Sequence, residues 1–220
     1  MDFNQILTFL ARLAKNNNRD WFEKNKGDYL QAKENYEAFV ARWLEELIKF
    51  NPELATLNPK KLVFRIYRDV RFSKDKSPYK INMGAGVSAN GKMEQEPGYY
   101  LHIQPGNQSF LAGGMYMPDA ANLAKIRQEI AYNAETVVGI LKDKKFRKWY
   151  NGLDHFDQLK TVPKGYAKDH PHLDLLKNKS FIVTHYFSDK EVKDKKFLKQ
   201  VTEAARAIKP LNDFLKAAIA

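Results

Sequence analysis

The sequence predicts an α+β domain in which a mainly antiparallel sheet, built as a meander, is covered by N-terminal and C-terminal helices. Three observations predict this fold class. Apolar residues recur at helical spacing at both ends of the chain, short alternating segments fill the middle, and turn residues separate those segments. With 220 residues, 44% of them hydrophobic, the chain suits one domain over residues 1–220.

Two helices are expected before the strands. Apolar residues from Phe3 to Leu13 lie on one face of a first helix, which the asparagine run 16–18 ends. A longer helix is predicted from about Asp28 to Lys49, and Pro52 lies in the loop that follows it.

Four consecutive segments are then predicted as strands joined by short turns. They are residues 62–72, 79–88, 99–104 and 109–115. The first alternates cleanly, and Asn90-Gly91 is the strongest short hairpin signal in the chain. Short turns between neighbouring strands indicate an antiparallel meander.

The helical pattern returns after Pro118. Apolar residues predict one helix around 121–130 and another around 137–141, whereas residues 151–179 are rich in turn formers. Residues 181–187 form a late strand, and a final helix begins near Phe197, with Pro210 expected to kink or split it.

Composition narrows the class of protein. The chain has no cysteine, which excludes disulfides, thiolate zinc sites and cysteine nucleophiles and favours a reducing compartment. It shows no secretory leader and no apolar run near the roughly 20 residues of a membrane helix. It also lacks a glycine-rich nucleotide loop. We therefore expect a cytoplasmic protein with no membrane partner and no cofactor.

Positive charge is concentrated in one short stretch. The net charge is +11, and residues 60–80 carry eight positive and two negative side chains, a net +6. The densest part is the segment Arg65–Lys80. Its cations are Arg65, Arg68, Arg71, Lys74, Lys76 and Lys80. So many like charges repel one another unless anions neutralise them.

This cationic segment predicts a candidate anion-binding site. In a strand over 62–72, Arg65 and Arg71 share a face with Tyr67 between them, and guanidinium groups suit bidentate binding of phosphate. The partner is then a phosphate-bearing ligand or a nucleic acid. The alternative is that these cations pair with carboxylates of the first long helix, such as Glu34 or Glu37. Arg68 falls on the apolar face, so it is either a structural ion pair or a pocket residue.

Tyr100 and His102 are weak catalytic candidates. They lie on the polar face of the predicted strand 99–104, where His102 is placed to act as a general acid or base near a bound anion. The alternative is a hydrogen-bonded histidine without a catalytic role. A turn explains Asp169-His170-Pro171-His172 better than metal ligation does, and no metal site is expected.

Four stretches of the chain resemble a known family. They are FRIYRDVRFSKDKSPYK (residues 64–80), NNNRDWFEKNK near the start, GYYLHIQPGNQSFLAGGMYMP in the middle and PKGYAKDHPHLDLLKNKSF later. Together they resemble DUF2461, a domain of unknown function. The resemblance implies a single α+β domain, widespread in bacteria and present in fungi. It implies no established activity and supplies no catalytic residues.

Three functions remain open from the sequence. The first is a binding module for an anionic ligand through Arg65–Lys80. The second is an enzyme acting on an anionic or phosphorylated small substrate, with an arginine clamp and His102 as acid or base. The third is a structural or interaction protein whose basic face confers solubility. The sequence makes no prediction of oligomeric state.

Overall fold

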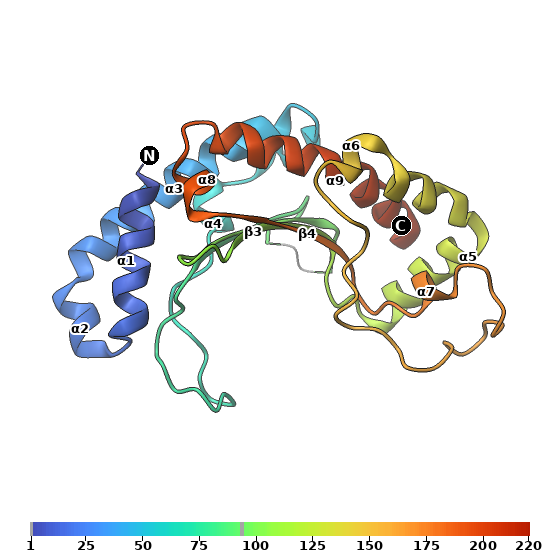
Figure 1. The fold of residues 1–220 in the computed structure, drawn as a ribbon, viewed down its shortest axis with the longest axis horizontal. Coiled ribbons are helices and arrows are strands. Elements are labelled where there is room, and N and C mark those ends of the chain that lie inside the picture. The colour runs from blue at the N-terminus through green and yellow to red at the C-terminus, as the bar shows by residue number, and fades with distance from the viewer. Residues whose placement is uncertain (1, 93–94) are drawn as a thin grey trace.

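A computed structural model describes residues 2–92 and 95–220 of the chain. It contains a four-stranded antiparallel sheet with helices α3 and α9 over one face (Figure 1). The strand order is β1-β2-β3-β4, so each strand pairs with the next one along the chain. The predicted fold class, an α+β meander with flanking helices, is confirmed.

The N-terminal helices begin at side-chain caps. The elements are α1 (Phe3–Lys15), α2 (Arg19–Lys24), α3 (Lys26–Ile48), the 3₁₀ helix η1 (Pro52–Thr56) and α4 (Pro59–Leu62). Asp2 accepts from the backbone N–H of Gln5, and Asn18 accepts from that of Trp21. These bonds satisfy N–H groups that a helix start leaves unpaired. The asparagine run therefore ends α1 and, two residues later, starts α2.

The sheet has a regular register. Its strands are β1 (Met83–Val87), β2 (Gly98–Ile103), β3 (Ser109–Met115) and β4 (Phe181–Phe187). Gly84 lies opposite His102, His102 opposite Phe110, and Phe110 opposite Tyr186. Residues directly opposite one another point to the same face, so this register brings polar and aromatic side chains of β2, β3 and β4 together, beside Gly84 of β1.

The remaining helices are α5 (Ala120–Lys142), α6 (Lys144–Arg147), α7 (Leu173–Leu176), α8 (Asp189–Lys193) and α9 (Phe197–Ile219). The two helices predicted over 121–141 form α5, which has non-helical dihedral angles at Asn133. Pro210 lies inside α9 without ending it.

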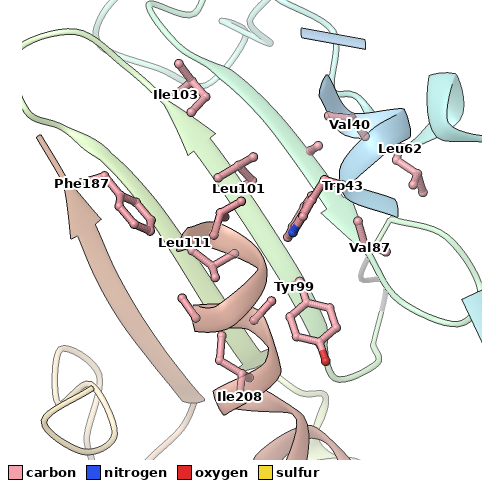
Figure 2. Packing of buried hydrophobic residues seen from close by; sticks show 14 of the residues in the cluster. Val40, Trp43, Leu62, Val87, Tyr99, Leu101, Ile103, Leu111, Phe187 and Ile208 are labelled. Atoms are coloured by element: carbon pink, nitrogen blue, oxygen red, sulfur yellow. The ribbon is translucent and has the colours of Figure 1, made fainter. Parts of the chain in front are cut away.

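The core lies between the sheet and helices α3 and α9 (Figure 2). Trp43, Leu101 and Ile208 have no exposed surface, and full burial of an aliphatic side chain such as Leu101 or Ile208 contributes about 1.5–3 kcal/mol. Gly113 permits the close approach of α9, since a Cβ there would lie 2.7 Å from the Ile208 side chain.

The prediction of a strand over residues 62–72 is wrong. Leu62 ends α4, and residues 63–82 form a long hairpin-like arm that projects from the sheet (Figure 1). The arm makes two isolated bridges, Val63 with Ala85 and Tyr67 with Tyr79. Arg68 N–H donates to the Pro78 carbonyl, but Pro78 has no N–H to return the bond, so the ladder stops there. The fourth strand of the sheet is the late one, β4.

Candidate functional site

The face of the sheet that points away from α3 and α9 is the candidate site, and we call it the open face. It carries Tyr100 and His102 of β2, Phe110 of β3 and Tyr186 of β4, which the register places side by side. Tyr186 is 60% exposed and the other three are partly exposed, whereas Leu101, on the helix-covered face, is fully buried. In Figure 1 the arm and the α5–α7 region flank this face on either side.

Four rings form a continuous row across the open face. Phe64 of the arm lies 5.9 Å from Tyr100, Tyr100 lies 5.8 Å from Phe110, and Phe110 lies 5.5 Å from Tyr186, all between ring centroids. We call these four residues the aromatic row. A Cβ at Gly86 would lie 3.2 Å from the Phe64 ring, so this glycine lets Phe64 rest on β1.

His102 lies beside the aromatic row in a closed hydrogen-bond network. Its ring stacks on Phe110, with centroids 4.5 Å apart and planes 12° apart. Nε2 donates to Gln104 Oε1 at 3.0 Å, while Nδ1 accepts from Tyr100 Oη at 3.2 Å and from Asn82 Nδ2 at 3.3 Å. These partners define a neutral ring protonated on Nε2.

Burial keeps the network uncharged. It lowers the pKa of His102, although the bond to Gln104 opposes this, and it raises the pKa of Tyr100. Desolvation disfavours the charged form of either group, so His102 stays neutral and Tyr100 stays protonated near neutral pH. The predicted catalytic pair thus lies together, with both histidine nitrogens engaged.

Lys80 and Lys92 lie at the end of the row formed by Phe64, and Arg65 follows Phe64 directly in the chain. The Nζ atoms of Lys80 and Lys92 lie 5.7 Å and 5.1 Å from the Phe64 ring centroid. Burial, followed by the charges of Arg65 and Lys92, lowers the pKa of Lys80. We call Arg65, Lys80 and Lys92 the basic cluster. Among residues 2–92 and 95–220, no carboxylate forms an ion pair with any of them.

The tip of the arm, residues 68–77, is partly neutralised from within. Arg68 forms an ion pair with Asp75, and Arg71 Nη2 lies 2.6 Å from Asp69 Oδ2. Lys76 donates to the Val70 carbonyl at 3.0 Å. Lys74 is exposed, and the described part of the chain offers it no ion-pair partner. Of the six predicted cations, the structure therefore pairs Arg68 and Arg71 with carboxylates at the tip and leaves Arg65 and Lys80 at the base without an ion pair among the described residues.

The expected partners on the long helix are engaged elsewhere or remain apart. Glu37 pairs with Lys33 of its own helix, at 3.4 Å. Arg68 does not lie on the apolar face of a strand, because residues 62–72 form none, and its partner comes from the same arm. Tyr67 is half-exposed and lies 5.4 Å from Tyr79 rather than between Arg65 and Arg71 on one strand face.

The base of the arm is anchored to α2 and to the turn that precedes it. The Tyr79 ring stacks on Phe22, with centroids 3.9 Å apart. The Asn17 side chain accepts from the Tyr79 N–H at 3.1 Å and donates to its carbonyl at 2.9 Å. The Asn17 side chain thus makes the two hydrogen bonds to the Tyr79 backbone that a neighbouring strand would make. These bonds hold the segment that carries Lys80 in place.

Sequence reasoning missed four members of the site: Phe64, Lys92, Phe110 and Tyr186. The alternation within 109–115 and 181–187 places Phe110 and Tyr186 on the face opposite Leu111 and Phe187, which is a usable signal. Lys92 carries no such signal, because the hairpin at Asn90-Gly91 brings it to Phe64.

The histidine-rich segment near residue 170 forms local contacts. His170 Nδ1 accepts from the His172 N–H at 3.1 Å, and His172 Nε2 lies 4.0 Å from Glu135. In the part of the chain that the structure describes, no three His, Cys, Asp or Glu side chains are grouped to hold a metal. Over the same residues, no helix has both the length and the apolarity to cross a membrane.

Comparison with known proteins gives one match. A family model described as a conserved hypothetical protein (DUF2461) matches residues 5–214. The match covers the arm, all four strands and most of α9. No curated protein and no solved structure matches the chain.

Proposed function

We propose that this chain, which belongs to the DUF2461 family of conserved hypothetical proteins, binds a phosphate-bearing ligand, free or within a nucleic acid, at the base of the arm. The observation that carries the proposal is the basic cluster. Lys80 and Lys92 both lie close to the Phe64 ring, and the charge of Arg65 acts on Lys80. None of the three forms an ion pair with a carboxylate among the described residues. Like charges held together repel one another, and a bound anion relieves that repulsion.

The base supports this proposal better than the tip does. At the tip, Asp69 and Asp75 already neutralise Arg71 and Arg68. An anion binding there competes with a carboxylate for each guanidinium, so binding gains less. Lys74 and Lys76 add positive charge at the tip and attract anions over longer distances.

An enzymatic role for His102 has weaker support from the geometry. Its hydrogen bonds go to Asn82, Tyr100 and Gln104, so accepting a substrate proton requires one of them to break. The network fits the task of orienting Tyr100 and Phe110 on the open face.

The setting we propose is the bacterial cytoplasm. A chain without cysteine gains nothing from an oxidising compartment, and a net charge of +11 suits contact with abundant intracellular phosphates and nucleic acids.

Titration calorimetry with a short inorganic polyphosphate tests the proposal. Lys80→Ala/Lys92→Ala is expected to weaken binding at least tenfold and to reduce the slope of log K against log salt by about 1 to 2. The matched control, Lys74→Ala/Lys76→Ala, removes the same charge from the tip and is expected to change binding less than threefold. Circular dichroism checks that each variant folds.

Two results would overturn the proposal. One is the absence of phosphate binding by the unmodified chain at low salt. The other is an equal loss of affinity in the two double variants, which would assign binding to overall charge rather than to the basic cluster.

A further inference from the structure

The aromatic row begins at the basic cluster and ends at the far edge of the sheet. Phe64 is shared, because its ring lies close to the Nζ atoms of Lys80 and Lys92 and also to the ring of Tyr100. From there the row crosses β2 and β3 and reaches Tyr186 on the edge strand β4. A phosphate at the basic cluster therefore lies at the start of a row of rings.

The spacing of the rings favours separated planar groups. Neighbouring centroids are 5.5–5.9 Å apart, and neighbouring planes are inclined by 51–64°. Bases stacked within one strand of a duplex rise by about 3.4 Å each, so they cannot each contact a different ring of this row. A duplex also keeps its base faces covered. The row therefore suits the unstacked bases of a single strand.

The row is electrically neutral where bases would lie. His102 is held neutral and covers one face of Phe110, and Tyr100 stays protonated. Every nucleobase has a π-face that stacks on aromatic side chains, and this contact does not require a particular sequence. Positive charge at one end and uncharged rings beyond it match a chain of phosphates that carries bases.

Polar groups lie beyond the last ring. Tyr186 lines a cavity of about 400 Å³ together with Asp154, His155 and Thr184. Thr184 Oγ1 donates to Asp154 Oδ2 at 2.6 Å, and burial raises the pKa of Asp154. A carboxylate accepts hydrogen bonds from the amino groups of bases and repels phosphate. This end of the row thus suits a base edge and disfavours the backbone.

Building on the proposed function, we infer that the open face binds single-stranded nucleic acid. Phosphates lie at Arg65, Lys80 and Lys92, and successive bases stack along the aromatic row towards Tyr186. We expect binding to depend little on the base sequence, because every base can stack on a ring and every nucleotide carries a phosphate.

Fluorescence anisotropy with a labelled twelve-nucleotide single strand tests this inference. Tyr186→Ala is expected to weaken binding about 5- to 100-fold, the range found when a stacking ring is removed. Tyr132→Ala is the matched control, because Tyr132 is an exposed tyrosine on α5 outside the row, and it is expected to leave binding unchanged. Neither substitution is expected to alter polyphosphate binding.

Competitors separate the possible sources of anionic charge. The unlabelled single strand is expected to compete at least tenfold better than the same sequence as a duplex or than heparin of equal charge. Equal competition by the duplex or by heparin would overturn the inference. So would equal behaviour of Tyr186→Ala and Tyr132→Ala.

The two proposals fail in different ways. If polyphosphate binds through Lys80 and Lys92 but the single strand shows no dependence on Tyr186, the proposed function stands and the inference falls. If neither ligand binds, both fall.

Discussion

The base and the tip of the arm both carry arginine and lysine, but only the arginines of the tip are paired with carboxylates. At the base, Arg65 and Lys80 meet Lys92 without a carboxylate partner among the described residues. At the tip, Arg68 and Arg71 each bind an aspartate of the same arm. The base is also packed and the tip is not, since the Tyr79 ring is buried against Phe22 whereas Phe72 is 95% exposed.

The comparison shows that a high density of cations in a sequence does not measure the charge available to a ligand. Asp69 and Asp75 lie two and seven residues from their arginines, close enough for local turns to pair them. Lys92 joins the base from another hairpin, and none of the described carboxylates forms an ion pair with it. The positive charge available to a ligand therefore depends on which acidic side chains the fold brings near the cations.

The largest expected effect tests the anchoring of the base. Tyr79→Ala removes the ring stacked on Phe22 and is expected to lower the free energy of unfolding by about 3–5 kcal/mol. Phe72→Ala, at the exposed tip, is expected to change it by less than about 0.5 kcal/mol. Urea denaturation measures both. Tyr79→Phe keeps the ring and serves as the control, and similar losses in Tyr79→Ala and Phe72→Ala would refute the distinction.

The prediction with an effect of intermediate size concerns the pKa of Lys80 at the base of the arm. Burial and the nearby Arg65 and Lys92 lower the pKa of Lys80 below its usual value, so Lys80 loses its charge at a lower pH than an ordinary lysine. At pH values between the pKa of Lys80 in the folded state and its higher pKa in the unfolded state, the unfolded state binds more protons. Over this range Lys80 therefore makes the free energy of unfolding rise with pH. Phosphate affinity falls over the same window.

The pKa of Lys80 is measurable by NMR of the lysine side chains. Arg65→Ala removes one of the neighbouring charges and is expected to raise it. Lys74→Ala, at the tip, is expected to leave it unchanged. If Arg65→Ala left the pKa of Lys80 unchanged, the two side chains would have to lie further apart than they do in the structure.

The smallest expected effect concerns the tip in acid. Hydrogen bonds from Ser77, and then from Arg68, lower the pKa of Asp75, and those from Arg71 lower that of Asp69. Their contribution to stability is present above the unfolded value of about 3.9 and is lost as the pH falls through the folded values. Relative to the intrinsic exchange rate at each pH, we expect the Ser77 amide to lose protection in acid, and in Asp75→Asn at neutral pH, while the amide of Tyr79 stays protected. Equal acceleration at both amides would show that tip and base open together.

Much of the fold was predictable because helices and strands leave local periodic signals. The strands expected over 109–115 and 181–187 have the same bounds in the structure, and the long helix expected from about Asp28 to Lys49 spans Lys26–Ile48. The error at 62–72 has a physical cause. Alternation shows that a segment is suited to a sheet, but a ladder needs a partner strand, and Pro78 interrupts the one available here.

The candidate site was predictable in part. Arg65, Lys80, Tyr100 and His102 were identified from charge and alternation, and they lie at or beside the open face. The pairing of Arg68 with Asp75, and the alignment of Phe64 with Phe110 and Tyr186, needed coordinates, because they depend on turns and on sheet register.

The sequence by itself determined the α+β class, the approximate bounds of the long helices and of three strands, and the excess of positive charge, because periodicity and composition are local properties of the chain. The tertiary structure decided which cations lack a carboxylate and which rings form one row. Those properties depend on distances between residues far apart in the chain, such as Phe64 and Tyr186, and charge–charge and ring–ring interactions act over a few ångströms of space rather than along the sequence.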